Sequence, residues 1–441
     1  MSKIYKLYFT HDKNIKITNK LDYLFAIESD FNKEIFDKCS SVCKTFIISS
    51  KSMMFEILKK EKNIKKNSLI GIVGISSSLL DEYAEIIKFY FEYEEIVKRI
   101  SKKMDKYNRT LIKNSDNYIV KDAIDKFIFH NGGGKYVRAF LIILGYMYKN
   151  HKNNLLDTYA DDLAIAYETF QTSILVHDDI IDNAQVRRGK PTIPKLYEND
   201  FSLNKITDND NTSNSLAICL ADLGFYEANE LIVSKYGKDK NFSKLISYYN
   251  NVVLKTIKGE IIDVYLPFKG KYMDYFASYN DVIEISKLKT SWYTVVGPFC
   301  LGLILSSVDN KKVKQFEEAL LPLGIAFQIK DDIMGVFASS VNLGKDCNDI
   351  SEFKQTLLYH YAVNSDYKDE LLKYYGKEKV DSSVVQKVRD IFIKSNAYDK
   401  SVDLMNSLFK ESKEKINNIK MDKEFRDILF GFISYLEIRE K

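Results

Sequence analysis

Residues 174–192 read ILVHDDIIDNAQVRRGKPT, and this stretch bears most directly on the fold. An apolar run ends in three aspartates, Asp178, Asp179 and Asp182, and two arginines, Arg187 and Arg188, follow. In a helix Asp178 and Asp182 share one face, where like charges repel and cost stability. A chain that keeps these charges at the end of a core helix is therefore predicted to use them on a cationic ligand.

Helical periodicity runs from Leu79 nearly to the C-terminus, and the chain has only 18 glycines and 5 prolines in 441 residues, which favours long helices. Several segments are apolar on most faces, as inner helices of a bundle are. Residues 291–308 carry no charge and approach membrane-spanning length. Their glycines, proline and hydroxyls, and the lack of a second such segment, favour a core helix. We expect an all-α fold over residues 76–441, a large helical bundle around a central cavity.

The first 75 residues have a different pattern and are predicted to form an N-terminal extension of unknown role. SKIYKLYF and KTFIISS read as short strands, and SLIGIVGISSS is a run of small residues before the first long helix. Within the bundle, the polar stretch 198–215 is expected to be a surface loop between two helices.

Composition narrows the classes of partner and the compartment. The formal net charge of +4 is too balanced to indicate nucleic-acid binding. The cysteines are scattered, without the spacing of a metal site, and are expected to be reduced thiols of a cytoplasmic protein. Residues 1–16 lack the apolar run of a signal peptide. We expect no membrane span.

A second acidic pair, Asp331 and Asp332, closes another apolar helix in AFQIKDDIMGVF (326–337). If the two acidic clusters face each other across a cavity, their oxygens suit two or three Mg²⁺ ions gripping a diphosphate, since Mg²⁺ prefers carboxylates and keeps water and phosphate as further ligands. The alternative for either cluster alone is an exposed helix end with loop aspartates.

Basic residues occur at several places that suit bound phosphates. The segment HNGGGKYVRAF (130–140) follows three glycines with Lys135 and Arg138, where backbone and helix-start amides can approach an anion. Further cations are Arg187, Arg188, Lys289, Lys345 and Lys354. Each alone reads as a solvated surface charge, whereas together they suit one metal-bound diphosphate and a second diphosphate held without metal.

These motifs, in this order, resemble the all-trans polyprenyl diphosphate synthase family, which includes farnesyl and geranylgeranyl diphosphate synthases. The resemblance runs from about Tyr118 to His360. The first motif, DDxxD followed by RRG, is met in full from Asp178 to Gly189. The remaining matches are GGKxxR at Gly133 to Arg138, Gln171, the pair Lys289 and Thr290, FQxxDD at Phe327 to Asp332, and the late lysines Lys345 and Lys354.

The resemblance implies the isoprenoid synthase fold and head-to-tail condensation of isopentenyl diphosphate with an allylic diphosphate by a homodimer. It implies three Mg²⁺ ions as cofactor, held by Asp178, Asp179, Asp182, Asp331 and Asp332. The implied catalytic residues are Lys289, Thr290, Gln328, Asp178 and Asp331. The implied substrate-binding residues are Lys135, Arg138, Gln171, Arg187, Arg188, Lys345 and Lys354.

The residues before the first aspartate partly indicate the length of the product. In the family, bulky residues four and five positions earlier stop chain growth, and here these positions hold Ile174 and Ser173. Ser173 leaves room, so a product of twenty carbons or more is expected. Phe170 and Tyr167, on the same helical face, are the next candidate floor, with core packing as the equal alternative.

Three positions depart from the family pattern. Gly335 stands where the second acidic motif has its third aspartate, Glu260 where glutamine is common, and Ala139 where proline is usual. Two other functions remain open from the sequence: a class I terpene cyclase, which needs no metal-free diphosphate site, and a non-catalytic regulatory subunit of another prenyl synthase.

Overall fold

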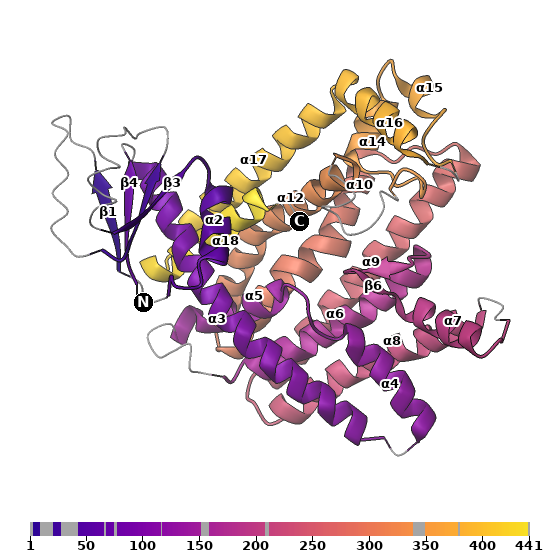
Figure 1. Ribbon diagram of the computed structural model, residues 1–441, viewed down its shortest axis with the longest axis horizontal. Helices are drawn as coiled ribbons and strands as arrows, with labels where there is room; N and C mark the ends of the chain where they lie inside the picture. The colour runs from indigo at the N-terminus through magenta and orange to yellow at the C-terminus, as the bar shows by residue number, and fades with distance from the viewer. Residues whose placement is uncertain are drawn as a thin grey trace. The chain divides into compact units, whose positions relative to one another are not determined.

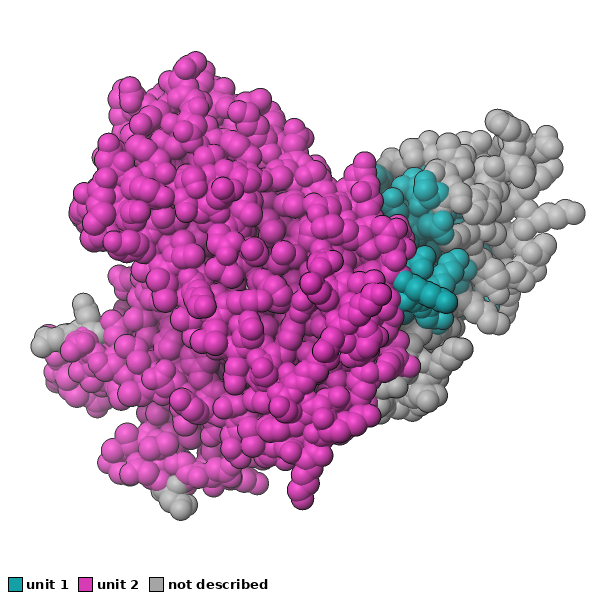
Figure 2. Space-filling model, turned by 180° about the vertical axis from the view of Figure 1, so that it is seen from behind, with its two compact units in different colours: residues 1–96, 420–440 teal, residues 97–419, 441 magenta. Residues whose placement is uncertain are grey.

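The computed structural model describes residues 3–8, 21–27, 43–65, 68–74, 77–115, 117–150, 158–207, 211–337, 349–377 and 380–439. The chain divides into two compact units, coloured separately in Figure 2. The sheet unit comprises residues 1–96 and 420–440, and the helical unit comprises residues 97–419 and 441. Lys345, one of the predicted substrate-binding residues, lies outside the described residues.

The helical unit is built of long helices joined by short connections (Figure 1). It begins within α3 (Ser77–Lys113) and continues through α4 (Tyr118–His130), α5 (Val137–Asn150), α6 (Asp161–Ile181), the short hairpin β5 (Val186–Arg187) and β6 (Lys190–Pro191), α7 (Ile193–Leu203), α8 (Asn211–Tyr236) and α9 (Phe242–Met273). The second half contains α10 (Tyr279–Ile285), the π-helix η3 (Ser286–Val296), α11 (Gly297–Leu305), α12 (Asn310–Phe337), α14 (Leu357–Val363), α15 (Lys368–Leu371), α16 (Ser382–Lys394) and α17 (Ala397–Asn417).

The helix η3 is held on two sides by helices that approach it at glycine. A side chain at Gly259 of α9 would place its Cβ 2.3 Å from the Lys289 backbone nitrogen, and one at Gly324 of α12 would lie 2.4 Å from the Ser291 Cα. Both separations are far below van der Waals contact, so only glycine permits this packing. The backbone that carries Lys289 and Thr290 is therefore fixed between α9 and α12.

The uncharged segment, which was predicted to be a core helix, lies inside the helical bundle. The stretch Tyr279–Leu305 is long and apolar enough to cross a membrane, but 83% of its most apolar window is buried inside the protein. All nine residues of α11 are buried, and α11 packs against α5 and α9. The segment is therefore a central helix of the bundle.

The expected loop over residues 198–215 is mostly helical, which corrects that prediction. Helix α7 continues to Leu203 and α8 begins at Asn211. Tyr197 is buried and stacks on Phe201, with 6.3 Å between ring centroids, and both belong to an apolar cluster with the first turns of α8. These aromatic contacts outweigh the weak helical preference of the polar residues around them.

The sheet unit contains a four-stranded parallel sheet in the order β1-β4-β2-β3. Its strands are β1 (Lys3–Tyr8), β2 (Tyr23–Ile27), β3 (Lys44–Ile48) and β4 (Leu69–Gly74), and its helices are α2 (Lys51–Lys60), the first part of α3, and α18 (Lys423–Ile438). The strands β1 and β3 were predicted, and β2 and β4 were not. The predicted division at residue 75 stays a prediction, since the compact unit around the sheet also includes the last helix.

Candidate active site

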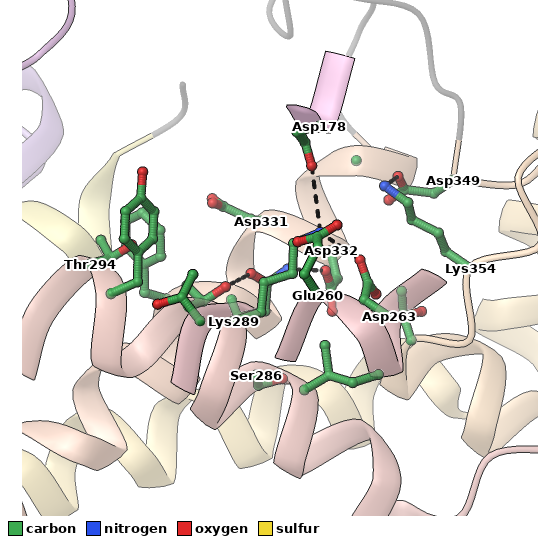
Figure 3. Close-up of a pocket in the computed structure, with 18 of the residues that line it drawn as sticks. Asp178, Glu260, Asp263, Ser286, Lys289, Thr294, Asp331, Asp332, Asp349 and Lys354 are labelled. Carbon is green, nitrogen blue, oxygen red and sulfur yellow. Dashed lines mark hydrogen bonds and ion pairs between the residues drawn. The ribbon is translucent and has the colours of Figure 1, made fainter. Parts of the chain in front are cut away.

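One cavity of about 350 Å³ contains both acidic clusters. Asp178 and Asp182 enter it from the end of α6, and Asp331 and Asp332 enter it from α12. Side chains from α5, α9, α10, η3 and the segment 349–356 also line it, and Figure 3 shows several of them. The structure thus brings together two aspartate clusters that are far apart in the sequence.

The first cluster is held by an arginine from the β5–β6 hairpin. Arg187 donates a hydrogen bond of 2.8 Å to Asp178 and a second hydrogen bond to Asp179. Burial raises the pKa of Asp179 to about 6 although Arg187 favours its ionised form. Burial also raises the pKa of Asp182 to about 6, against the attraction of Lys354. Both carboxylates resist ionisation here, and a bound cation would relieve that resistance.

The second cluster is linked to η3 by hydrogen bonds. Gln328 donates to Asp332 through its Nε2 over 2.6 Å, and the Thr290 hydroxyl donates to the Gln328 Oε1. The pKa of Asp332 lies well above its ordinary value, because the side chain is buried and Asp349 lies close by. Gln328 is thereby oriented from both ends, with Thr290 and Asp332 as its two partners.

Two lysines bring positive charge between the clusters. Lys289 lies 2.6 Å from Asp263, 3.0 Å from Glu260 and 3.6 Å from Asp178. Burial opposes the charge on Lys289, but these three carboxylates together raise its pKa above the ordinary range. The ammonium of Lys289 is therefore kept charged inside the cavity, at a point where Figure 3 shows it beside Glu260 and Asp263.

The second lysine, Lys354, lies 3.1 Å from Glu352 and 3.8 Å from both Asp182 and Asp349. Its pKa is also raised well above the ordinary value, since these carboxylates outweigh the effect of burial. Sequence reasoning did not single out Asp263, Glu352 or Asp349. The only signal for Asp263 is its position three residues after Glu260, which puts both on one helical face.

The predicted metal-free diphosphate residues are only partly gathered. Arg138 lines the cavity, donates 2.8 Å to Thr294 and stacks on the Tyr293 ring at 4.0 Å. Arg188 lies over the glycine loop, where a Cβ on Gly134 would be 3.0 Å from its guanidinium. Lys135 is exposed on that loop, and Gln171 is buried in α6, and neither lines the cavity.

A buried carboxylate that the sequence did not reveal supports these arginines. Glu168 is buried, and its pKa is raised by burial although Arg138 and Arg188 both favour its charge. Its Oε1 accepts a hydrogen bond of 3.0 Å from the backbone of Ala139. Proline, which the family usually has at this position, would offer no N–H. The departure at Ala139 therefore has a local use in this chain.

The residues predicted to govern product length differ in their access to the cavity. Ile174 lines it, whereas Ser173 is fully buried beneath α8 and α4. A Cβ on Gly224 of α8 would lie 2.2 Å from the Ser173 hydroxyl and 2.4 Å from the Phe127 ring. The room that the small Ser173 leaves is thus filled by the neighbouring helices and does not extend the cavity.

Behind Ile174 lies a cluster of buried aromatic rings. Phe170 contacts Tyr167, Phe225, Tyr249 and Tyr293, with ring centroids 5.3 to 5.8 Å apart. Tyr167 also donates a hydrogen bond of 2.8 Å to the Tyr293 carbonyl. Phe170 and Tyr167 are therefore core residues, and of these rings only Tyr293 also lines the cavity.

Comparison with known proteins assigns this helical architecture to a family. A sequence model of polyprenyl synthetases matches residues 119–392. The chain belongs to the polyprenyl synthetase family. Relatives include a short chain isoprenyl diphosphate synthase of Methanocaldococcus jannaschii, 24% identical over 69% of this chain and 84% of the relative. A farnesyl pyrophosphate synthase of Saccharomyces cerevisiae is 25% identical over 73% of this chain and 91% of the relative.

Solved structures confirm the predicted all-α isoprenoid synthase fold for this polyprenyl synthetase. A geranylgeranyl pyrophosphate synthase of Corynebacterium glutamicum, complexed with isoprenyl diphosphate and magnesium, superposes with a TM-score of 0.72 and 21% identity. The match covers 79% of this chain and 99% of that protein. A polyprenyl synthase of Caulobacter crescentus gives a TM-score of 0.63. As a family member, the chain is a trans-prenyltransferase.

Proposed function

We propose that the chain condenses isopentenyl diphosphate with an allylic diphosphate to a linear product of fifteen or twenty carbons. The observation that carries the proposal is one cavity lined by two acidic clusters, by Lys289 and Lys354, and by Arg138. A terpene cyclase has no need of the cations around Arg138 and Arg188. A regulatory subunit could lose its carboxylates, and this chain keeps all those of the two motifs except the one that Gly335 replaces.

Mg²⁺ is the proposed cofactor, and the donor set fits it. Four aspartates of the two acidic motifs, Asp178, Asp182, Asp331 and Asp332, are among the residues that line the cavity, and hard cations prefer such oxygens. Among the described residues, no three acidic, histidine or cysteine ligands are already gathered into a cluster that holds a metal. When bound, Mg²⁺ would neutralise the negative charge of the departing diphosphate.

The protein's own groups would act around the allylic diphosphate. The ammonium groups of Lys289 and Lys354, together with Arg187, would stabilise the charge that develops as the C1–O bond breaks. The Thr290 hydroxyl and the Gln328 amide oxygen would face the resulting allylic cation with their dipoles. A new bond then joins C1 to C4 of isopentenyl diphosphate, and the proton at C2 of that unit passes to the departing diphosphate.

Isopentenyl diphosphate is proposed to bind at the glycine loop, beside Arg138 and Arg188, with Lys135 and Gln171 nearby. This part of the proposal is supported by the loop's location under Arg188 and by the buried Glu168 carboxylate, whose charge both arginines favour. Binding of the second diphosphate would bring Lys135 onto it, since this side chain is exposed on the loop.

The proposed product length rests on the end of the cavity. Ile174 and Tyr293 line it, and the ring cluster around Phe170 lies behind them. The tight packing of Ser173 against Gly224 argues against the longer products that its small size alone suggests. Fifteen or twenty carbons also accords with the farnesyl and geranylgeranyl synthases to which the chain is similar.

A homodimer is proposed from the exposed faces of α8 and α9. Apolar side chains follow one face of α9 at helical spacing: Ile257, Ile261, Val264, Tyr265, Phe268 and Tyr272. Helix α8 also exposes apolar side chains, at Ile218, Tyr226 and Val233. Soluble monomers rarely expose so much contiguous apolar surface, and a two-fold axis lets one such surface cover its copy. Phe268→Glu should yield monomer in analytical ultracentrifugation, whereas Lys410→Glu, at an exposed position of α17, should leave the dimer intact.

A cytoplasmic location is proposed as well. Cys219 and Cys300, both described, form no disulfide. Unpaired thiols are typical of proteins in a reducing compartment. Fractionation of cells expressing the full chain would test this, and recovery with a membrane or secreted fraction would contradict it.

The experiment that tests the function is product analysis with purified protein, Mg²⁺, labelled isopentenyl diphosphate and allylic primers of five, ten and fifteen carbons. A linear diphosphate series ending at one length is expected. Asp178→Ala should abolish it, and Asp403→Ala, at an exposed position of α17, should not. A cyclic hydrocarbon formed from the allylic diphosphate alone would establish a cyclase. No turnover with any primer would favour the regulatory subunit.

A further inference from the structure

The helical unit contains a second cavity, of about 370 Å³, that shares no lining residue with the active-site cavity. Most of its lining residues lie on one face of α9, and Trp292 of η3 and Glu317 of α12 line it as well. Ser247 and Asn251, which also line it, are exposed, so the cavity is open to solvent. None of its lining residues belongs to the apolar face of α9 that is proposed for the dimer. A small molecule can therefore enter it without passing through the active site.

Two lysines bring positive charge into this second cavity. Burial lowers the pKa of Lys255 although Glu317 favours its charge, and burial lowers the pKa of Lys244 in the same way. In the active site the opposite holds, because carboxylates around Lys289 and Lys354 outweigh burial and raise their pKa values. The ammonium groups of the second cavity thus lack adequate negative charge nearby, and a bound anion would supply it.

The side chains around Lys255 supply more hydrogen-bond donors than acceptors. The Lys255 ammonium lies 2.9 Å from the centroid of the Trp292 ring. An aromatic face attracts this charge but accepts no conventional hydrogen bond, so oxygen atoms of a ligand can still bind the ammonium. The Glu317 carboxylate already accepts a hydrogen bond of 2.8 Å from the Tyr248 hydroxyl. The cavity therefore suits a ligand that is rich in acceptor oxygens.

The floor of the second cavity is apolar and closely packed. Val252 is buried, and a Cβ on Gly297 would lie 2.8 Å from its Cγ1 and 2.5 Å from the Trp292 carbonyl oxygen. Neither Val252 nor the Trp292 backbone can move inward, so the cavity keeps its shape. Its volume falls within the range of small-molecule sites, about 300 to 1,000 Å³. Beside an anionic group there is room for an organic part on Val252 and the indole ring.

We propose that this cavity is a second ligand site, which binds a small molecule bearing a phosphate group, with the phosphate at Lys255 beside Trp292. A phosphate monoester carries almost two negative charges at neutral pH and three strong acceptor oxygens, which matches the excess of donors. Lysine binds phosphate as a point charge. Lys244 is eleven residues from Lys255 on α9, about 16 Å along the helix axis, so it would contact the far end of the ligand.

The test uses the fluorescence of Trp292, which is the only tryptophan of the chain and therefore reports on this cavity. The purified full chain is titrated with phenyl phosphate and, separately, with inorganic phosphate. A chelator removes divalent cations, and potassium acetate keeps the ionic strength constant. A saturable change with a Kd below about 1 mM is expected for at least one probe. Tighter binding of phenyl phosphate would identify an organic phosphate as the ligand, and equal affinities would identify the free ion.

Matched variants locate the bound phosphate. Lys255→Met keeps the length of the side chain, removes its charge and should raise the Kd at least about tenfold. Lys244→Met should raise it less. Lys410→Met, the same change at an exposed position of α17, should leave it unchanged. Arg138→Gln, in the proposed metal-free diphosphate site, should also leave it unchanged, because that site is a different cavity.

Three results would overturn the inference. They are no saturable change with either probe, equal weakening in Lys255→Met and Lys410→Met, and weakening in Arg138→Gln without weakening in Lys255→Met. The last result would place the phosphate in the active-site cavity. The titration needs neither divalent cations nor turnover, so its failure would leave the proposed function intact. A chain that makes no prenyl product could still show this binding.

Discussion

Replacing Asp182 with asparagine should stabilise the ligand-free protein while it destroys metal-dependent diphosphate binding. The carboxylate of Asp182 has a pKa raised from 3.8 to about 6, mainly by burial, and its side chain is 17% exposed. A tenfold change in proton affinity corresponds to about 1.4 kcal/mol, so the ionised form costs the folded state on the order of 3 kcal/mol. Asparagine has the same shape as the protonated group and lacks this cost.

The stabilisation that Asp182→Asn provides must depend on pH in a definite direction. Because the folded-state pKa is higher than the unfolded one, the cost is complete above about pH 6 and disappears as the pH falls below about 4. For 441 residues the entropy of unfolding is on the order of 0.9 kcal/mol/K, so the melting temperature at pH 7.5 should rise by about 3 °C.

The assay is differential scanning calorimetry of wild type, Asp182→Asn and Asp403→Asn at pH 7.5 and pH 4.5, without divalent cations. The stabilisation by Asp182→Asn should be largest at pH 7.5 and much smaller at pH 4.5, and Asp403→Asn should melt as wild type does at both. A lower melting temperature for Asp182→Asn at pH 7.5, or an equal gain at both pH values, would refute the electrostatic reasoning. The same variant should no longer be stabilised by Mg²⁺ with inorganic diphosphate.

The same geometry leads to three further predictions. Wild-type protein should melt at a higher temperature with Mg²⁺ plus inorganic diphosphate than with either alone, since the ligands bind only the folded state; calorimetry showing no increase would contradict a joint site. Ile174→Phe should shorten the product of the labelled-isopentenyl assay by one or more five-carbon units, because it narrows the end of the cavity. An unchanged chain length would show that other residues close the end of the cavity. Gly224→Ala should lower the free energy of unfolding by about 1 to 3 kcal/mol in urea titrations, since its Cβ would lie 2.2 Å from the Ser173 hydroxyl; a neutral effect would show that α6 and α8 can separate.

The acidic clusters could be predicted from sequence because charge at the end of an apolar helix is a conflict that local structure does not resolve. This conflict identifies Asp178 and Asp331 from the sequence alone. Asp349 could not be found in this way, because it lies among polar neighbours where a carboxylate needs no explanation. Asp263 is a single carboxylate between Ile262 and Val264, without a second one beside it. The structure places Asp349 in the lining of the cavity, which its sequence neighbours do not indicate.

The fold was predictable to the extent that its periodicity is visible. The helical unit shows the spacing of buried faces, whereas β2 is buried at four of its five residues and so has no alternation to detect. Ser173 illustrates a second limit. Its small size was read as room for a product, but the same size serves close packing against Gly224, and a sequence alone does not separate the two uses.

The π-helix η3 makes the spacing between Lys289 and α11 intolerant of any change in length. A π-helical segment holds more residues per turn than an α-helix, so removing one residue would let η3 tighten and rotate one end against the other by roughly 100°. Helix α11 is buried on every side and cannot take up the rotation. The rotation would therefore act on Lys289 and Thr290 and move their side chains out of the cavity. Across relatives with this segment, substitutions should therefore accumulate while insertions and deletions do not.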